Sequence, residues 1–574
     1  MAHRPDLVLR NGTVIDGSGG EPFRADVAVE AGVITEVGAV GAAGREEIDA
    51  KGCLVTPGFV DIHTHYDGQV TWDARLQPSS LHGVTTAVLG NCGVGFAPVQ
   101  PVHHGMLIEL MEGVEDIPGA ALHEGLPWTW SSFPEYLDAI ERMPHDIDVC
   151  AQVPHGALRV YVMGERGANR EAASDAEIAA MADLVAQALG AGALGFTSSR
   201  TMQHRTSKGE PTPTLTAAEA ELRGIAAGLR RAGAGVIEMI SDFDDLDGEF
   251  ARFCRMVEDA GRPMTISLAQ HDGAPGKWKE LLAQIEGARA RGLPIKGQVA
   301  PRPIGVLLGL DCTLHPFVAC PSYRAIAKQP LAERVRALRD PELRSRLLGE
   351  TAQSSNATVR YIARSYHKLF RLGDPPDYEP DPGQSVAAQA ERAGRPPAEL
   401  AYEWLLDNDG REILYFPLHN FSEQSLDAVR AMMAHDATLA GLGDGGAHVG
   451  TICDASFTTY ALTHWGRDRA RGRFELPWLI KRQTHDTAAA VGLADRGLVR
   501  PGMKADLNVI DFDRLRLHRP YIVHDLPARG RRLMQTAEGY VATVVSGAVT
   551  YRGGEPTGAL PGTLVRGAQA RRTP

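Results

Sequence analysis

The stretch PGFVDIHTHYD, residues 57–67, governs the interpretation of the whole chain. A short apolar run ends in His63 and His65, and side chains two residues apart on a strand face the same side. Both imidazoles should therefore point into one space, with Asp61 and Asp67 nearby, and these residue types suit a divalent metal. A bare His-x-His is more often two unrelated histidines, so the sequence around the motif has to decide.

Segments with the period-two alternation of β-strands occur at both ends of the chain. LVLRNGTVID near the start and the late residues 505–513 and 540–558 alternate apolar and polar side chains between glycine-containing turns. We expect one β-sandwich domain made from residues 1–57 and 486–558. A C-terminal tail, 559–574, follows it.

The middle of the chain, residues 58–485, alternates apolar runs with Ala/Leu-rich helical stretches. TTAVLGN, GALGFTSS and GVIEMIS are examples of the runs, and SDAEIAAMADLVAQALGAG is one of the stretches. This rhythm predicts an α/β fold with a parallel sheet, and eight such units close a (β/α)8 barrel. The region of about 303–385 breaks the rhythm and contains the Pro-rich GDPPDYEPDPG, so we expect an inserted lid over the barrel mouth.

The composition excludes several classes of protein. The 574 residues are 44% hydrophobic and 23% charged, as in ordinary globular proteins, and the net charge of −12 argues against nucleic acid as a partner. No apolar run approaches about 18 residues, so we expect no membrane span. The start has no apolar signal region, and seven scattered cysteines without a CxxC pair fit a reducing compartment. We therefore expect a cytoplasmic protein with a small-molecule partner, and a homo-oligomer stays open.

Two glycine-rich motifs each place a metal-binding type of side chain after an apolar run. In HGVTTAVLGNCGVGFAP (82–98), Cys92 follows a predicted strand and offers a soft thiolate ligand to the same space. In TLAGLGDGGAHVG (438–450), Asp444 can bind a metal and take a proton from water. A lone Cys is more often inert and an Asp-Gly-Gly is more often an ordinary turn, so neither motif identifies a site alone.

Taken together, these motifs resemble the amidohydrolase superfamily and, within it, the N-acyl-D-amino-acid deacylases (D-aminoacylases). LVLRNGTVIDGSG, VPHGALRVYVMG (153–164), GALGFTSS and GLVRPGMKADLNVID (497–511) complete the resemblance. It implies a (β/α)8 barrel with a β-sandwich and one or two zinc ions, or another divalent metal, at the barrel mouth. His63 and His65 are then first-strand ligands, Cys92 resembles a bridging thiolate, and Asp444 resembles the final-strand ligand and general base.

The scarcity of lysine separates branches of this superfamily. Hydantoinase- and dihydroorotase-like members bridge two metals with a carboxylated Lys after the His-x-His motif. Between His65 and Glu238 this chain has one Lys, Lys208, in the polar stretch TSKGEPTPT. Cys92 is the better bridging candidate, which favours the deacylase branch.

The chain also departs from the deacylase pattern. Deacylases supply two further histidines from the next strands, whereas this chain has VIEMIS (236–241) and TISLAQHDG (265–273). Glu238 stands in the first position and is a candidate ligand through a carboxylate oxygen. Leu268 stands near the second and offers no ligand, although His271 follows it. Gln270 replaces a substrate-contacting Lys of the family.

Candidate substrate-binding residues follow from their positions after apolar runs. A guanidinium there could grip a substrate carboxylate, and a histidine beside Asp444 could contact substrate. We expect His419 to be a surface or packing residue. The candidates for substrate binding are His448, Gln270, Arg302 and Arg200.

The sequence therefore predicts a metal-dependent hydrolase of carbon–nitrogen bonds other than peptide bonds. Its expected reaction converts an N-acyl-D-amino acid and water to a carboxylate and a D-amino acid. One alternative is a cyclic amidase, lactonase or other hydrolase with the same metal chemistry. A second is a metal-poor relative that binds a small molecule without turnover. A dinucleotide-dependent dehydrogenase is excluded because no GxGxxG opens a helix after a strand.

Overall fold

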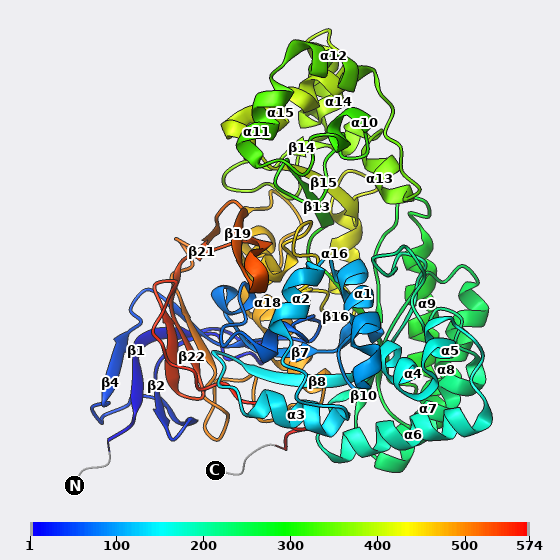
Figure 1. The fold of residues 1–574 in the computed structure, drawn as a ribbon. Helices are drawn as coiled ribbons and strands as arrows, with labels where there is room; N and C mark the ends of the chain where they lie inside the picture. The colour runs from blue at the N-terminus through cyan, green and yellow to red at the C-terminus, as the bar shows by residue number, and fades with distance from the viewer. Residues whose placement is uncertain (1–3, 571–574) are drawn as a thin grey trace.

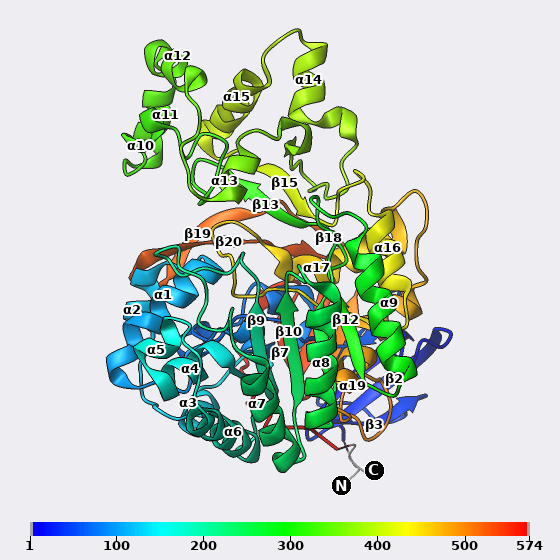
Figure 2. The same ribbon diagram turned by 90° about the vertical axis from the view of Figure 1, so that its right-hand side faces the viewer.

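Eight parallel strands form a barrel, as the strand–helix alternation predicts (Figure 2). The computed structural model describes residues 4–570. The barrel closes beyond the ends of its first and last strands, where Thr64 pairs with Gly445 and the His65 N–H donates to the Gly445 carbonyl. In chain order the strands are β6 (Phe59–Asp61), β7 (Val84–Leu89), β8 (Asp148–Pro154), β9 (Gly195–Arg200), β10 (Val236–Ser241), β11 (Met264–Ser267), β12 (Ile295–Val299) and β16 (Thr438–Ala440).

Helices flank the barrel because each carries one apolar stripe. In α7 (Glu219–Ala232) the buried Leu222, Ile225, Ala226 and Leu229 recur at helical spacing and face the core. The long α6 (Asp175–Gly190) begins at a Ser-x-x-Glu capping box that satisfies its first N–H groups. Other helices around the strands are α1 (His104–Glu115), α2 (Gly119–Gly125), α3 (Phe133–Glu141), α4 (His155–Met163), α8 (Leu246–Ala260), α9 (Lys277–Ala290), α16 (Asp427–Ala434), α18 (Leu476–Gln483) and α19 (His485–Ala490).

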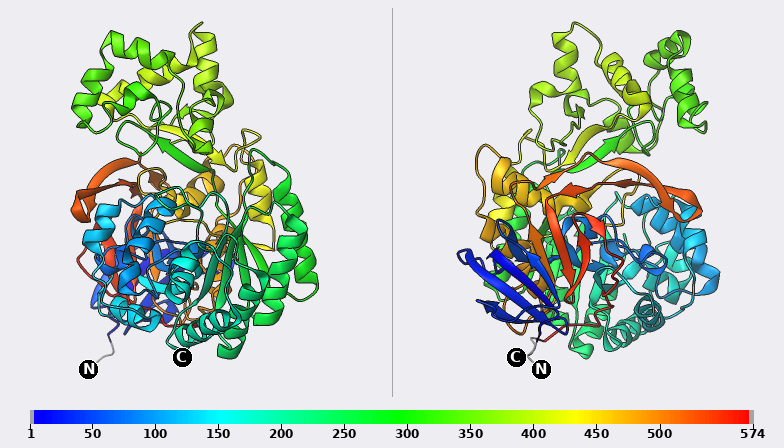
Figure 3. Two further views of the ribbon diagram at one scale, coloured as in Figure 1. Left: turned by 45° about the vertical axis from the view of Figure 1, so that its right-hand side comes forward. Right: turned by 90° about the vertical axis from the view of Figure 1, so that its left-hand side faces the viewer.

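A nine-stranded sheet joins the two ends of the chain. Early and late strands lie side by side in it (Figure 3), and the central contact is the antiparallel pairing of β5 with β17. Its apolar side chains form a core separate from that of the barrel. The strands are β1 (Leu7–Val14), β2 (Phe23–Glu30), β3 (Val33–Gly38), β4 (Glu46–Asp49), β5 (Leu54–Pro57), β17 (Leu507–Ile510), β22 (Tyr540–Val545), β23 (Ala548–Arg552) and β24 (Glu555–Pro556).

The chain leaves the barrel after β12 and builds a separate unit before it returns to β16 (Figure 1). A three-stranded antiparallel sheet carries this insertion, and the insertion has its own apolar core. Its sheet lies on the side toward which the barrel strands point (Figure 2). Its elements are β13 (Ile304–Leu308), α10 (Pro321–Arg324), α11 (Leu331–Leu338), α12 (Pro341–Gly349), α13 (Ala357–Ile362), β14 (Phe370–Arg371), α14 (Val386–Arg392), α15 (Pro397–Gly410) and β15 (Leu414–His419).

A hairpin and the C-terminal segment complete the structure. β19 (Tyr521–Leu526) and β20 (Gly530–Met534) pair between the barrel mouth and the insertion (Figure 2). Within the predicted tail, residues 562–569 hydrogen-bond to the start of β8 and to the end of α19, while residues 571–574 lie outside the described part of the chain. No helix from residue 4 to residue 570 has the length and apolarity to span a membrane. The α/β barrel with a terminal sheet and an inserted region confirms the predicted fold class.

Candidate metal centre and its cavity

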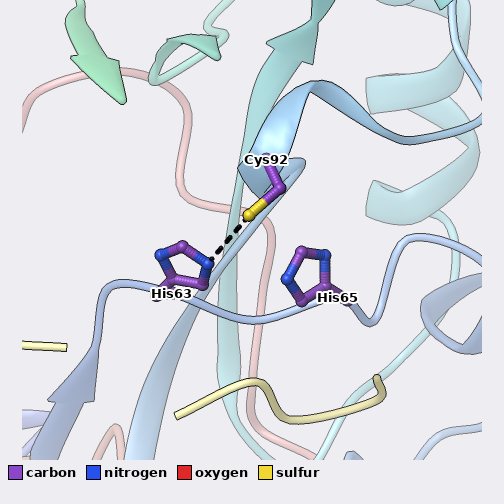
Figure 4. A group of neighbouring side chains, drawn as sticks. All are labelled: His63, His65 and Cys92. Atoms are coloured by element: carbon purple, nitrogen blue, oxygen red, sulfur yellow. Dashed lines mark hydrogen bonds between the residues drawn. The ribbon is translucent and has the colours of Figure 1, made fainter. Parts of the chain in front are cut away.

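Three buried side chains converge at the carboxyl ends of the first two barrel strands (Figure 4). One ligand-type atom from each of His63, His65 and Cys92 lies within 4.8 Å of those of the others. Cys92 Sγ is 3.4 Å from His63 Nε2. Asp444 adds an oxygen, since its Oδ1 lies 3.4 Å from His63 Nε2 and 3.7 Å from His65 Nε2. The four residues that the sequence singled out thus meet in space.

Unusual backbone conformations present these side chains. Cys92 follows β7 through a tight turn with φ 55°, and Asp444 and His448 have φ 47° and 50°. Such left-handed conformations are strained for residues with a Cβ and cluster at functional sites. Gly90, with φ 81°, precedes this turn, and a Cβ there would lie 2.3 Å from the backbone oxygen of Gln152. The Gly-Asn-Cys-Gly motif is therefore required by the turn that aims Cys92.

The other ring nitrogen of each histidine lies against a polar group, with hydrogen-bond alignment at His63 and as a charge contact at His65. His63 Nδ1 lies 2.9 Å from Gln298 Oε1, and the Gln298 amide donates to Thr265. His65 Nδ1 lies 3.2 Å from Glu115 Oε1. Such partners fix the ring orientation of metal-binding histidines, and here they leave the Nε2 atoms facing Asp444.

The electrostatics of the cluster are those of a buried, acid-rich site. Burial lowers the pKa of His63 to about 4. Burial also opposes charge on His65, but the carboxylates of Glu115 and Asp444 outweigh it and raise that pKa to about 9. Burial would raise the pKa of Asp444, yet the neighbouring imidazoles of His65 and His63 hold it well below its usual range. Asp444 therefore stays ionised at neutral pH.

The donor set and several unpartnered oxygens fit a divalent cation. Glu115 Oε2, Asp61 Oδ2 and Glu238 Oε1 are buried without a hydrogen-bond partner, which is costly unless a cation or proton satisfies them. Burial raises the pKa of the Cys92 thiol, but a coordinated thiol is deprotonated outright. Imidazole, thiolate and carboxylate together are ligands typical of zinc.

Glu238 lies beside the cluster but does not join the group of three. Its Oε2 accepts the Cys92 backbone N–H at 2.8 Å, so it supports the turn that carries Cys92. Burial raises its pKa to about 8. The neighbouring strand offers no ligand at Leu268, whose side chain is fully buried in the apolar core.

A cavity of about 220 Å³ opens over the cluster. His448 lines it, with Nε2 3.7 Å from Glu115 Oε2. His271 and His419 also line it, with ring centroids 4.3 Å apart. His419 ends β15 of the insertion, so it is a wall residue of this cavity as well as a packing residue.

The other sequence candidates point elsewhere. Gln270 is fully buried, and its amide oxygen accepts the Ser422 N–H. Arg200 forms an ion pair with Glu249. Arg302 bonds to Asp454 at 2.8 Å, with its guanidinium stacked over Tyr378. None of Gln270, Arg200 and Arg302 lines the cavity.

Sequence reasoning missed several residues of this site. Glu115, His204 and Asp242 line the cavity, and no motif marked them. Glu115 did carry a signal, because it lies on the buried face of α1, four residues after Met111, where an acid is unexpected. His204 belongs to a loop whose course the sequence does not define, whereas Asp242 directly follows β10, a position that could have marked it.

Comparison with known proteins places the chain in a family. The model of the Amidohydrolase family matches residues 46–551. An uncharacterized protein of Mycobacterium tuberculosis (strain ATCC 25618 / H37Rv) is 27% identical over 96% of this chain and 92% of its own length. A D-aminoacylase of Alcaligenes xylosoxydans xylosoxydans is 31% identical over 50% of this chain and 55% of its own length.

Solved structures share the fold across the chain. A D-aminoacylase described with a binuclear metal centre has a TM-score of 0.65 at 24% identity, covering 98% of this chain and 100% of its own. The N-acyl-D-glutamate deacylase from Bordetella bronchiseptica, complexed with zinc and a phosphonate inhibitor, has the same TM-score, identity and coverage. At this identity the likeness concerns the fold.

Proposed function

Because this chain belongs to the amidohydrolase family and is a hydrolase related to the D-aminoacylases, we propose that it cleaves a linear amide C–N bond with the help of a divalent metal. The substrate class is an N-acylated D-amino acid unit, and the products are a carboxylate and the free amine. The names of several relatives support this class, since they include a D-aminoacylase, an N-acyl-D-aspartate deacylase and an N-acyl-D-glutamate deacylase.

One observation carries the proposal: His63, His65 and Cys92 converge within 4.8 Å, with the Asp444 carboxylate against both histidines. These residues would hold one zinc-type ion. When bound, such an ion supplies Lewis acidity that polarises an amide carbonyl and makes water a stronger acid.

Asp444 moves the proton in this proposal. Its low pKa keeps the carboxylate ionised, so an oxygen of Asp444 can accept a proton from the attacking water. The same group, once protonated, can give that proton to the leaving nitrogen. His65, held by Glu115, stays oriented toward Asp444 through both transfers.

The positions of the lysines do not support the alternative function of a cyclic amidase, in which a carboxylated lysine bridges two metals. Lys208, the one Lys between the His-x-His motif and Glu238, is 65% exposed and pairs with Glu109 at the surface. No Lys is found among the described residues that line the cavity. A bridging carboxylated lysine therefore has no candidate here.

Two measurements on the same samples test the proposal. They are the metal content and the rate of hydrolysis of N-acetyl-D-amino acids and their amides. We expect about one divalent ion per chain, loss of that ion in Cys92→Ala, and its retention in Asp444→Asn with kcat lowered by about 10²–10⁴. Cys150→Ala is the matched control, because Cys150 is equally buried on β8 but belongs to a different apolar cluster. Wild type that binds no divalent metal after zinc is supplied, or that cleaves no amide, contradicts the proposal.

A further inference from the structure

The cavity is rich in carboxylates. Glu115, Asp242 and Asp444 line it, and no Lys or Arg does so among the residues that the structure describes. Glu115 and Asp444 contact the two histidines of the metal cluster. Asp242 does not belong to that group, so its charge is available to whatever fills the rest of the cavity.

Asp242 is held in place as an acceptor. It follows the end of β10, and its two carboxylate oxygens accept the Thr201 hydroxyl and the Met202 N–H. Both donors come from the loop after β9, which also contributes His204 to the cavity. A carboxylate fixed by two donors is a preorganised acceptor for a cation or an N–H group.

Three histidines that line the cavity beside the metal cluster add no positive charge, whereas His65, with its raised pKa, lies against the carboxylates of Glu115 and Asp444. Burial lowers the pKa of His419 and that of His204 to about 3 each. Burial also lowers the pKa of His271. These three rings are therefore neutral hydrogen-bonding groups at neutral pH.

Two lysines contact residues in or next to the cavity wall without lining the cavity themselves. Lys277 donates to the backbone carbonyl of Asp242 at 2.8 Å, and Lys368 pairs with Asp272. Arg200 and Arg302, which the sequence suggested as carboxylate ligands, pair with Glu249 and Asp454. A substrate carboxylate beside Asp242 would therefore find no lysine or arginine in the described cavity wall to pair with, and like charges so placed repel.

We propose that this cavity binds amide substrates that carry no free carboxylate, and that Asp242 determines this specificity. Such substrates are N-acylated amino acid amides, or N-acylated amines whose remaining end is neutral or cationic. The inference rests on the proposed function and narrows it, because the acylated D-amino acid unit then has its carboxyl group blocked. Asp242 acts on the charge of the bound molecule and takes no part in bond cleavage.

A matched pair of ligands tests the inference on the metal-loaded enzyme. N-acetyl-D-leucinamide and N-acetyl-D-leucine differ only in the amide that replaces the carboxylate. We expect N-acetyl-D-leucinamide to bind more tightly than N-acetyl-D-leucine, measured by calorimetry, by about tenfold or more. Its kcat/KM for release of acetate should be higher by the same factor. In Asp242→Asn the ratio of the two kcat/KM values falls several-fold, mainly because the KM for N-acetyl-D-leucine becomes lower. Asp244→Asn, which removes an exposed charge two residues away, leaves the ratio unchanged.

The binding arm separates this inference from the proposed function. If neither compound is hydrolysed, the proposed function fails, and tighter binding of the amide still supports the specificity. The specificity is overturned if N-acetyl-D-leucine binds as tightly as the amide or more tightly, or if neither compound binds. The comparison on wild type decides the preference for a blocked carboxyl group even if Asp242→Asn does not fold.

Discussion

Glu115→Gln should weaken metal binding about tenfold without unfolding the protein. Glu115 is 1% exposed, and its Oε1 lies 3.2 Å from His65 Nδ1. A charged hydrogen bond is worth about 1.5–3 kcal/mol, and loss of a carboxylate behind a metal-binding histidine lowers metal affinity about 10–100-fold. The contact lacks hydrogen-bond alignment, since His65 Nδ1 has no hydrogen-bond partner, so we expect the lower end of that range.

The assay is the dissociation constant for zinc, measured by competition with a chromophoric chelator on protein stripped of metal. Glu109→Gln is the matched control, because Glu109 lies on the same helix and pairs only with the exposed Lys208. We expect that control to bind zinc as wild type does. Unchanged zinc affinity in Glu115→Gln, with unchanged unfolding of the metal-free protein, refutes the role given to Glu115.

Two further predictions concern stability. Gly90→Ala should lower the free energy of unfolding by about 2–5 kcal/mol, because the new Cβ brings left-handed strain and a 2.3 Å contact with backbone. Gly292→Ala is the control: at φ 88° with open space around it, it should lower the free energy of unfolding by about 1–2 kcal/mol. The two variants are compared by their urea-unfolding midpoints, and equal losses contradict the account of the turn. Burial opposes charge on Glu379, but hydrogen bonds from Arg469 and His464 lower its pKa from 4.5 to about 2. Its stabilisation should therefore be complete above about pH 4.5 and lost as the pH falls toward 2. The difference in thermal midpoint between wild type and Glu379→Gln, measured from pH 6 to pH 2, should shrink toward the acid end, and a constant difference contradicts this sign.

The fold was largely predictable because it follows from local patterns. A strand of the barrel such as β7 is buried at every residue, and its sequence, VTTAVL, shows this by containing no charged residue and no apolar/polar alternation. The terminal strands carry apolar residues at alternate positions, and these pack into a core of their own. The pairing of β5 with β17, about 450 residues apart, follows from the likeness of the two ends and not from either segment alone.

The site was predictable only where a strand end fixes the side chain. His63, His65, Cys92 and Asp444 follow barrel strands directly, so the geometry of the fold brings them together. Arg302 failed as a cavity residue because the chain turns after β12, which directs its guanidinium to Asp454. His419 joins the cavity through the antiparallel pairing of β15 with β13, a long-range contact within the insertion that no local spacing encodes.

The departures at Glu238 and Leu268 favour one ion per chain over two. Leu268 is packed in the apolar core and one oxygen of Glu238 is engaged by the Cys92 N–H, which leaves Glu238 Oε1 as the one ligand atom at these two positions and no second group of three in the described chain. Catalytic zinc sites combine three protein ligands with one position left for water or substrate. His63, His65 and Cys92 meet that requirement by themselves, and Asp444 is then free to act on protons. The packing of Leu268 and the hydrogen bond from the Cys92 N–H to Glu238 therefore support the proposal of one ion per chain.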